Sequence, residues 1–233
     1  MKKYSSVLFL VSAAWLAAGC SADQALPIGP CFEPAEHSIA SYVDPLETEA
    51  VITYWHQAVG QSGDGRATYD NMQIELYVGG VKPITLITPR TDPKRYDSLA
   101  RAHQDYNYWG NPALSAHDVL YNGVTGLKIV SDTDYDAAHP AGASLNDIFS
   151  LTLQEVVKGS ADGIPAYVFR EKNYAALTDM PQEGGPHLLG RVLVLKPLKA
   201  PDATSTHIFY IMYENQAGKT LPAWTKAFTI VKE

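Results

Sequence analysis

The sequence contains little cysteine, little charge and no long apolar segment. Only two cysteines, Cys20 and Cys31, occur in 233 residues, which excludes the disulfide-dense scaffolds of small secreted proteins. Charged residues make up 18% of the chain, and the formal net charge is −7. No run of lysine or arginine offsets this acidity locally, so the composition argues against nucleic-acid binding. With 46% hydrophobic residues and no internal repeat, the chain is typical of a folded globular protein.

The first residues have the pattern of a secretion signal. Lys2 and Lys3 provide a positive start, Val7 to Ala18 form an apolar stretch, and small residues precede Cys20. This stretch is shorter than the roughly 20 residues needed to span a bilayer. We therefore predict a cleaved signal peptide over residues 1–19 and not a transmembrane helix.

The end of this segment, Leu16-Ala17-Ala18-Gly19-Cys20, resembles the bacterial lipobox. The resemblance implies that the peptide before Cys20 is removed and that the Cys20 sulfur carries a diacylglycerol. Two or three acyl chains anchor a protein stably in a membrane, whereas one chain does not. Ser21 and not aspartate follows the cysteine, which favours the outer membrane, on either its periplasmic or its surface face. The alternative is a soluble secreted protein with an incidental cysteine.

Residues 20–45 contain four prolines, Pro27, Pro30, Pro34 and Pro45, and few apolar residues in any period. This composition predicts an extended tether between the lipid anchor and a folded domain over residues 46–233. Cys31 lies within the tether, without the rigid base that a catalytic thiol needs, so we interpret it as a tether residue.

Beyond the tether, strand patterns dominate. Residues 72–78 alternate apolar and polar side chains with a period of two, which is typical of a half-buried strand. Asp92 before Pro93, followed by apolar residues at helical spacing up to His103, predicts one short helix in a long connecting loop. Because the strands do not alternate with helices, we expect an all-β fold, an antiparallel β-sandwich that is immunoglobulin-like or related. Further strands are expected over residues 50–57, 84–87, 124–131, 148–157, 166–170, 191–195, 206–213 and 224–231.

The last third of the chain has the most regular pattern. Residues 206–213 are apolar on both faces and are followed by a polar turn and a second apolar run over residues 224–231. These features predict a hairpin that includes a central strand. Pro222 lacks a backbone donor, which suits a strand start or a sheet edge.

The segments Gly126–Asp136 and His139–Phe149 resemble a group of uncharacterised lipoproteins from Bacteroidota. This chain and that group share a strand, an acidic turn, a small-residue loop and a Leu-Asn-Asp sequence before an aromatic residue. The resemblance covers roughly residues 120–231 and the signal peptide. It implies a lipid-anchored β-rich domain and brings no catalytic residue with it.

Three aspartates, Asp132, Asp134 and Asp136, occupy alternate positions in the acidic turn. This spacing matches the start of a calcium loop, but Ala137 and Ala143 replace the glycine and the final acidic ligand of an EF-hand. An EF-hand is therefore excluded. A looser metal site completed by Asp147 and a solvated acidic turn remain the two alternatives, and we expect no metal and no cofactor.

An aromatic cluster in the long loop provides candidate ligand-binding residues, Tyr106, Tyr108 and Trp109. Aromatic faces beside amide and carboxylate groups can stack on sugar rings. The alternative is that these rings cover the core. No nucleophile elbow, phosphate loop or zinc-type histidine spacing occurs, so no catalytic residue is predicted.

Together these features predict a lipid-anchored protein of the bacterial outer membrane that serves as a non-enzymatic binding or assembly module. Its partners would be the membrane, through Cys20, and a glycan or a protein, but no nucleic acid. The alternative is a glycan-binding or glycan-acting accessory protein. A glycan-acting enzyme would need two carboxylates facing each other across a cleft.

Overall fold

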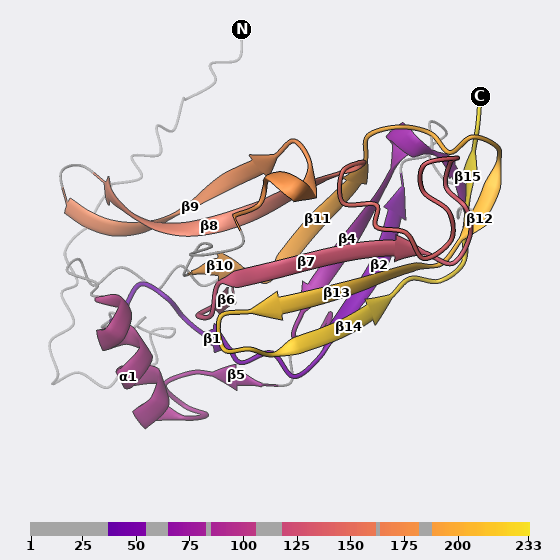
Figure 1. Cartoon of the computed structure of the whole chain (residues 1–233). Helices are drawn as coiled ribbons and strands as arrows, with labels where there is room; N and C mark the ends of the chain where they lie inside the picture. The colour runs from indigo at the N-terminus through magenta and orange to yellow at the C-terminus, as the bar shows by residue number, and fades with distance from the viewer. Residues whose placement is uncertain (1–36, 55–64, 83–84, 106–117, 162–163, 182–187) are drawn as a thin grey trace, which may run out of the picture. The chain divides into compact units, whose positions relative to one another are not determined.

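A computed structural model describes residues 37–54, 65–82, 85–105, 118–161, 164–181 and 188–233. The described chain contains one α-helix, α1 (Pro93–His103), and two short 3-10 turns, η1 (Tyr69–Asn71) and η2 (Leu177–Asp179). All other regular elements are strands (Figure 1). In chain order they are β1 (Tyr42–Val43), β2 (Thr48–Tyr54), β3 (Arg66–Thr68), β4 (Met72–Val78), β5 (Leu86–Ile87), β6 (Val119–Leu120), β7 (Val124–Ser131), β8 (Phe149–Ala161), β9 (Ile164–Tyr174), β10 (Leu189–Gly190), β11 (Val192–Pro197), β12 (Ser205–His207), β13 (Phe209–Asn215), β14 (Thr220–Trp224) and β15 (Phe228–Val231).

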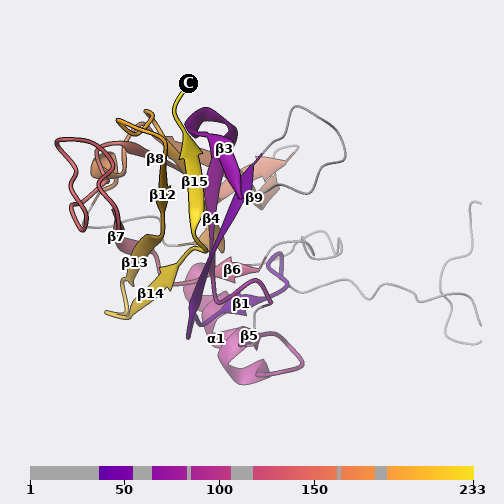
Figure 2. The same ribbon diagram turned by 90° about the vertical axis from the view of Figure 1, so that its right-hand side faces the viewer.

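The strands form three sheets. The largest has nine strands, in the order β2-β4-β11-β8-β10-β6-β1-β5, and β9 pairs with β8 as a long hairpin. Two sheets have three strands each, in the orders β14-β13-β7 and β12-β15-β3. Among the described strands, the β1–β6 and β3–β15 pairs are parallel and the others are antiparallel. Figures 1 and 2 show β7, β13 and β14 as a separate layer beside the large sheet, so the expected all-β, sandwich-like fold is confirmed.

The main core lies between these layers. Phe209, Ile211 and Tyr213 of β13 belong to the same buried cluster as Ile74 of β4 and Leu193 of β11. The cluster also contains side chains from β7, β8 and β15. A second cluster lies under α1, where Tyr96 packs with residues of β1, β6, β8 and β9.

Strand β13 alternates strictly between buried and exposed residues. Phe209, Ile211 and Tyr213 are buried, whereas Tyr210 and Met212 face solvent. The central position expected for this strand is confirmed, because β13 pairs with β7 on one side and with β14 on the other. Its apolar character on both faces, however, does not reflect burial on both faces.

The C-terminal hairpin differs from the expected one. The run over residues 206–213 breaks at Ile208 into β12 and β13, which belong to different sheets. Strand β13 pairs with β14, which lies mostly before the return run expected over residues 224–231. That run contains β15, which pairs with β12 instead of β13. Pro222 lies within β14, which is an edge strand as its missing donor suggested.

The helix is capped at both ends, and its N-terminal cap is the one that the sequence predicts. The Asp92 side chain accepts a hydrogen bond from the Arg95 amide at 3.2 Å, and Pro93 occupies the first turn. Gln104 ends the helix with a left-handed backbone (φ 55°). Asp105, which is fully buried, then accepts hydrogen bonds from the amides of Ser38 and Ile39 at 2.9 and 3.0 Å.

The folded domain therefore begins before residue 46. Ile39, Tyr42 and Val43 are buried, and β1 pairs with both β5 and β6. The proline-rich composition of residues 20–45 does not reveal this earlier start of the domain. The residue that holds the segment, Asp105, lies more than sixty residues further along the chain.

We expect Ile211→Ala to lower the free energy of unfolding by about 2 to 5 kcal/mol, because Ile211 is only 1% exposed in the main core. The matched control is Met212→Ala on the opposite face of the same strand, with an expected change within about 0.5 kcal/mol. Urea unfolding measures both values. Equal losses in the two variants would mean that β13 is buried on both sides.

Candidate functional site

The residues predicted from sequence fall into two groups. Cys20, Tyr106, Tyr108 and Trp109 lie outside the described residues, so their predictions stand as made. The acidic turn is described, and the structure shows where each of its carboxylates points.

The three aspartates of the acidic turn bond to separate parts of the chain. Asp132 Oδ1 accepts from the Ile208 amide at 2.7 Å, and Asp134 Oδ1 accepts from the Ala141 amide at 2.7 Å. Each carboxylate thus holds one loop backbone in place. Within the described residues, no group of three or more His, Cys, Asp or Glu side chains is arranged to hold a metal ion.

Asp136 forms a charged cluster with a histidine that the sequence did not single out. His139 Nδ1 lies 2.7 Å from Asp136 Oδ1, and His139 Nε2 lies 3.1 Å from both carboxylate oxygens of Asp147. Lys199 Nζ lies 2.6 Å from Asp136 Oδ2. This cluster joins the two ends of the loop over residues 132–147 and ties the loop to the connection between β11 and β12.

The cluster shifts two pKa values in opposite directions. Burial favours a neutral Asp136, but Lys199, His139 and the Ala138 amide outweigh it and hold the pKa of Asp136 well below its usual range. Burial also favours a neutral His139, but hydrogen bonds to Asp136 and Asp147 raise the pKa of His139 above its usual value. Both groups are therefore stabilised in their charged forms.

A second histidine, His207, lies between two serines and resembles a nucleophile and its base. Ser205 Oγ lies 2.7 Å from His207 Nε2, and Ser131 Oγ lies 2.8 Å from His207 Nδ1. Ser205 donates its only proton to the Ala203 carbonyl at 3.0 Å, so His207 Nε2 must donate to Ser205. Ser131 receives the Thr133 amide and donates to Nδ1, which completes a directed chain.

At Ser205 this direction is the reverse of what nucleophilic catalysis needs, because the histidine would have to accept the serine proton. Ser131 does donate to the histidine, but it is buried and so is not accessible to a substrate. Burial lowers the pKa of His207, which keeps the ring neutral and matches the directed chain. We therefore interpret Ser131, His207 and Ser205 as a satisfied polar network of the core.

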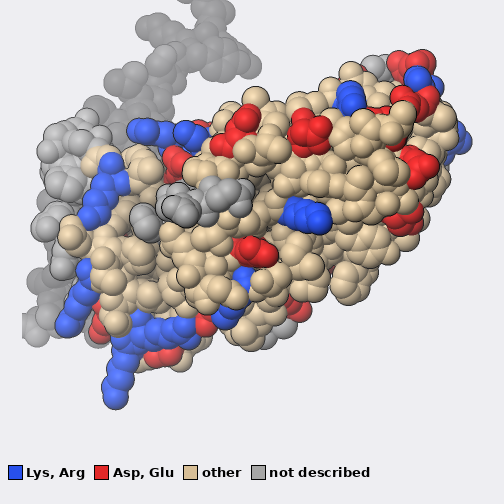
Figure 3. All heavy atoms as spheres, viewed as in Figure 1, with Lys and Arg blue, Asp and Glu red and all other residues tan. Residues whose placement is uncertain are grey.

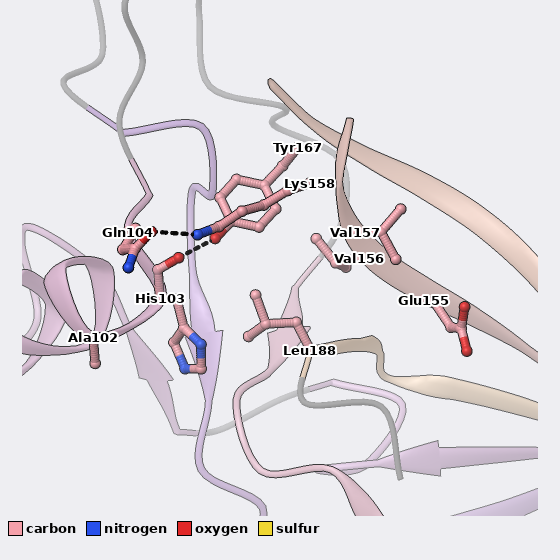
Figure 4. A pocket seen from close by; sticks show the side chains of 9 residues that line it. All are labelled: Ala102, His103, Gln104, Glu155, Val156, Val157, Lys158, Tyr167 and Leu188. Atoms are coloured by element: carbon pink, nitrogen blue, oxygen red, sulfur yellow. Dashed lines mark hydrogen bonds between the residues drawn. The ribbon is translucent and has the colours of Figure 1, made fainter. Parts of the chain in front are cut away.

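A pocket lies where α1 meets the β8–β9 hairpin (Figure 4). Its volume is about 600 Å³, and its lining includes His103, Gln104, Lys158 and Tyr167. Lys158 Nζ donates to Gln104 Oε1 at 2.7 Å, and Tyr167 Oη donates to the His103 carbonyl. The polar atoms at this junction thus fasten the helix to the hairpin.

The strongest candidate for a binding surface is the outer side of β7, β13 and β14, which we call the aromatic face. Cross-strand register arranges its nine residues in three rows. The rows are Val130–Tyr210–Trp224, Lys128–Met212–Pro222 and Gly126–Glu214–Thr220.

Three large side chains dominate the aromatic face and all are exposed. Trp224 is 64% exposed, Tyr210 45% and Met212 39%. Figure 3 shows that the side of the molecule carrying these strands is mostly uncharged. Scattered apolar residues are normal on a protein surface, but these three are neighbours in the sheet register, which makes the face a candidate interaction site.

A groove runs along the open edge of the aromatic face, between β14 and β2. Its volume is about 460 Å³, and it is lined by residues 46–50 and 221–224. Thr48 Oγ1 donates to the Pro222 carbonyl at 2.9 Å, which links the two strands. Leu46 and Trp224 are exposed at this groove, and Glu47 and Glu49 contribute its charged side chains. We call this feature the edge groove.

Sequence reasoning missed the aromatic face because it interpreted residues 206–213 as apolar on both sides. The available signal was the phase of the alternation. Tyr210 and Met212 share a phase with Glu214, and Pro222 and Trp224 share a phase with Thr220. A charged or polar residue in the same phase marks the side of a strand that faces water.

Neither a family profile, nor a curated protein, nor a solved structure matches this chain. None of the described helices has the length and apolarity needed to cross a bilayer.

We expect the contributions of the two buried histidines to the free energy of unfolding to depend on pH in opposite directions. The raised pKa of His139 contributes stability that is complete below about pH 6.5 and is lost as pH rises through its folded value. The lowered pKa of His207 contributes stability above about pH 6.5 that is lost as pH falls. We therefore expect urea unfolding between pH 5 and 9 to show two differences from the wild type. The free energy of unfolding should decline less above pH 6.5 in His139→Gln, and it should decline less below pH 6.5 in His207→Gln.

The wild-type profile is the reference for both variants. If both variants keep that profile, the charged cluster and the directed serine–histidine network are both wrong.

Proposed function

We propose that this protein is a lipid-anchored protein of the bacterial outer membrane whose β-sandwich is a non-enzymatic binding module. The aromatic face is the observation that supports a binding role. It exposes a tryptophan, a tyrosine and a methionine side by side on a regular sheet, which is a rigid support for ligand contacts. The signal peptide and the lipobox-like sequence ending at Cys20 support the anchor.

Hydrolysis receives less support than binding from the described residues. The edge groove contains two carboxylates, Glu47 and Glu49, but both come from the same segment of chain. Glu49 Oε2 accepts from the Val81 amide at 3.1 Å, and Glu47 Oε1 lies against Gly80. These carboxylates thus hold the turn after β4 and do not face each other across the groove, as a glycoside-hydrolysing pair would.

Fractionation of the producing bacterium tests the anchor. We expect Cys20→Ala to move the protein from the outer-membrane pellet to the soluble fraction, because the acyl chains hold it there. Cys31→Ala, the only other cysteine substitution that the chain offers, should leave the protein in the pellet. Retention of Cys20→Ala in the pellet after a high-salt wash would contradict the lipid anchor.

Thiol labelling tests the binding role without assuming a ligand. In a Cys31→Ala background, a Met212→Cys variant places one thiol in the centre of the aromatic face, and a Leu198→Cys variant places one at another exposed apolar position. We expect maleimide to label Met212→Cys more slowly in native envelopes than in purified protein, and Leu198→Cys at the same rate in both. Equal labelling of Met212→Cys in both preparations would contradict binding at this face.

A further inference from the structure

We infer that the aromatic face binds an uncharged saccharide chain, which stacks on Tyr210 and Trp224 and extends toward the edge groove. This inference rests on the proposed binding function and names the ligand class of the same surface. The arrangement of the rings, the charges beside them and the size of the surface each support it.

The two rings occupy directly opposite positions on neighbouring strands. Tyr210 of β13 is the register partner of Trp224 of β14. The Cβ atoms of such partners lie about 4.5 to 5.5 Å apart, so the two side chains leave the sheet side by side. Sugar rings present flat C–H faces that pack on aromatic rings, and a chain that crosses the strands meets Tyr210 first and Trp224 next.

The charges beside the rings favour a ligand without net charge. Lys128 lies in the row next to the aromatic row, Glu214 lies in the row beyond it, and the two carry opposite signs. Glu214 would repel an anionic ligand, and Lys128 would repel a cationic one. Hydroxyl groups both donate and accept hydrogen bonds, so a saccharide can use both side chains as well as the Thr220 hydroxyl.

The size of the face argues against a second copy of this chain. Three strands spaced about 4.8 Å apart and five residues of about 3.3 Å each give a projected area of roughly 240 Å². A stable protein–protein interface buries about 800 Å² on each partner. The face is therefore too small for a stable dimer but sufficient for a few sugar rings.

The edge groove extends the site along the path of the saccharide. Trp224 borders both the aromatic face and the groove, so a ligand that leaves Trp224 enters the space beside β2. The groove volume of about 460 Å³ lies within the range of roughly 300 to 1,000 Å³ that is usual for ligand sites. The Thr48 hydroxyl, which donates to the Pro222 carbonyl, keeps an acceptor there for a sugar hydroxyl.

Affinity electrophoresis tests this proposal with the purified full chain in detergent. Native gels contain one soluble polysaccharide each, from a panel of β-glucan, xylan, galactomannan, arabinan and α-glucan. We expect at least one of them to retard the wild type. Trp224→Ala and Tyr210→Ala should weaken this retardation at least tenfold, Trp224→Phe should weaken it less, and raising the salt concentration should leave it unchanged because the ligand is uncharged.

Leu198→Ala is the matched control, since Leu198 is another exposed apolar side chain outside the face. It should bind like the wild type. Thermal unfolding should give the same melting temperature for Trp224→Ala as for the wild type, which separates lost binding from lost folding.

Three outcomes would overturn the saccharide assignment. They are no retardation by any polysaccharide, retardation that Trp224→Ala leaves unchanged, and a concentration-dependent dimer in sedimentation that Trp224→Ala abolishes. If Met212→Cys remains protected in native envelopes while every polysaccharide fails, the ligand class is wrong and the binding function stands. If that protection is also absent, both are wrong.

Discussion

The burial of one side of β13 against the large sheet is the constraint on which the rest of the structure depends. Phe209, Ile211 and Tyr213 enter the main core, and the pleat of a strand then directs the intervening residues to the opposite side. A shift of one residue in register would exchange the two sets. Seven registered pairs with β7 and five with β14 oppose such a shift, so the position of Tyr210 on the outer side is fixed by the core.

Long-range polar contacts hold the connections in place where the sheets do not. Asp105 fastens residues 38 and 39 to the end of α1, and Asp136, His139 and Lys199 close the acidic loop. In both places a carboxyl group is bonded to backbone amides or to a cation, as a buried polar group requires. Acidic residues that suggested a metal site in the sequence thus serve to order loops in the structure.

Regular elements could be predicted from the sequence where local patterns determine them. Residues 72–78 and 124–131 match β4 and β7 residue for residue, and the helix from Pro93 to His103 is predicted by its cap and spacing. The break at Ile208 could not be predicted, because the Ile208 amide there donates to the carboxylate of Asp132, 76 residues earlier in the chain. The aromatic face was missed for a related reason, since an apolar residue on a strand does not show by itself whether another layer covers it.

The edge of β14 helps to explain which partners the aromatic face can have. Exposed edge strands invite pairing with another chain, and Pro222 interrupts this edge. The Pro222 carbonyl points toward Thr48, away from β13, so the Pro222 nitrogen faces the open edge as well, where it has no proton to donate. Because Pro222 has no amide proton and its carbonyl already accepts from Thr48, the middle of β14 offers an incoming strand no donor and only a partly engaged acceptor. Strand addition is thereby discouraged while the side chains of Tyr210, Met212 and Trp224 stay accessible, and this combination favours a ligand that lies flat on the sheet.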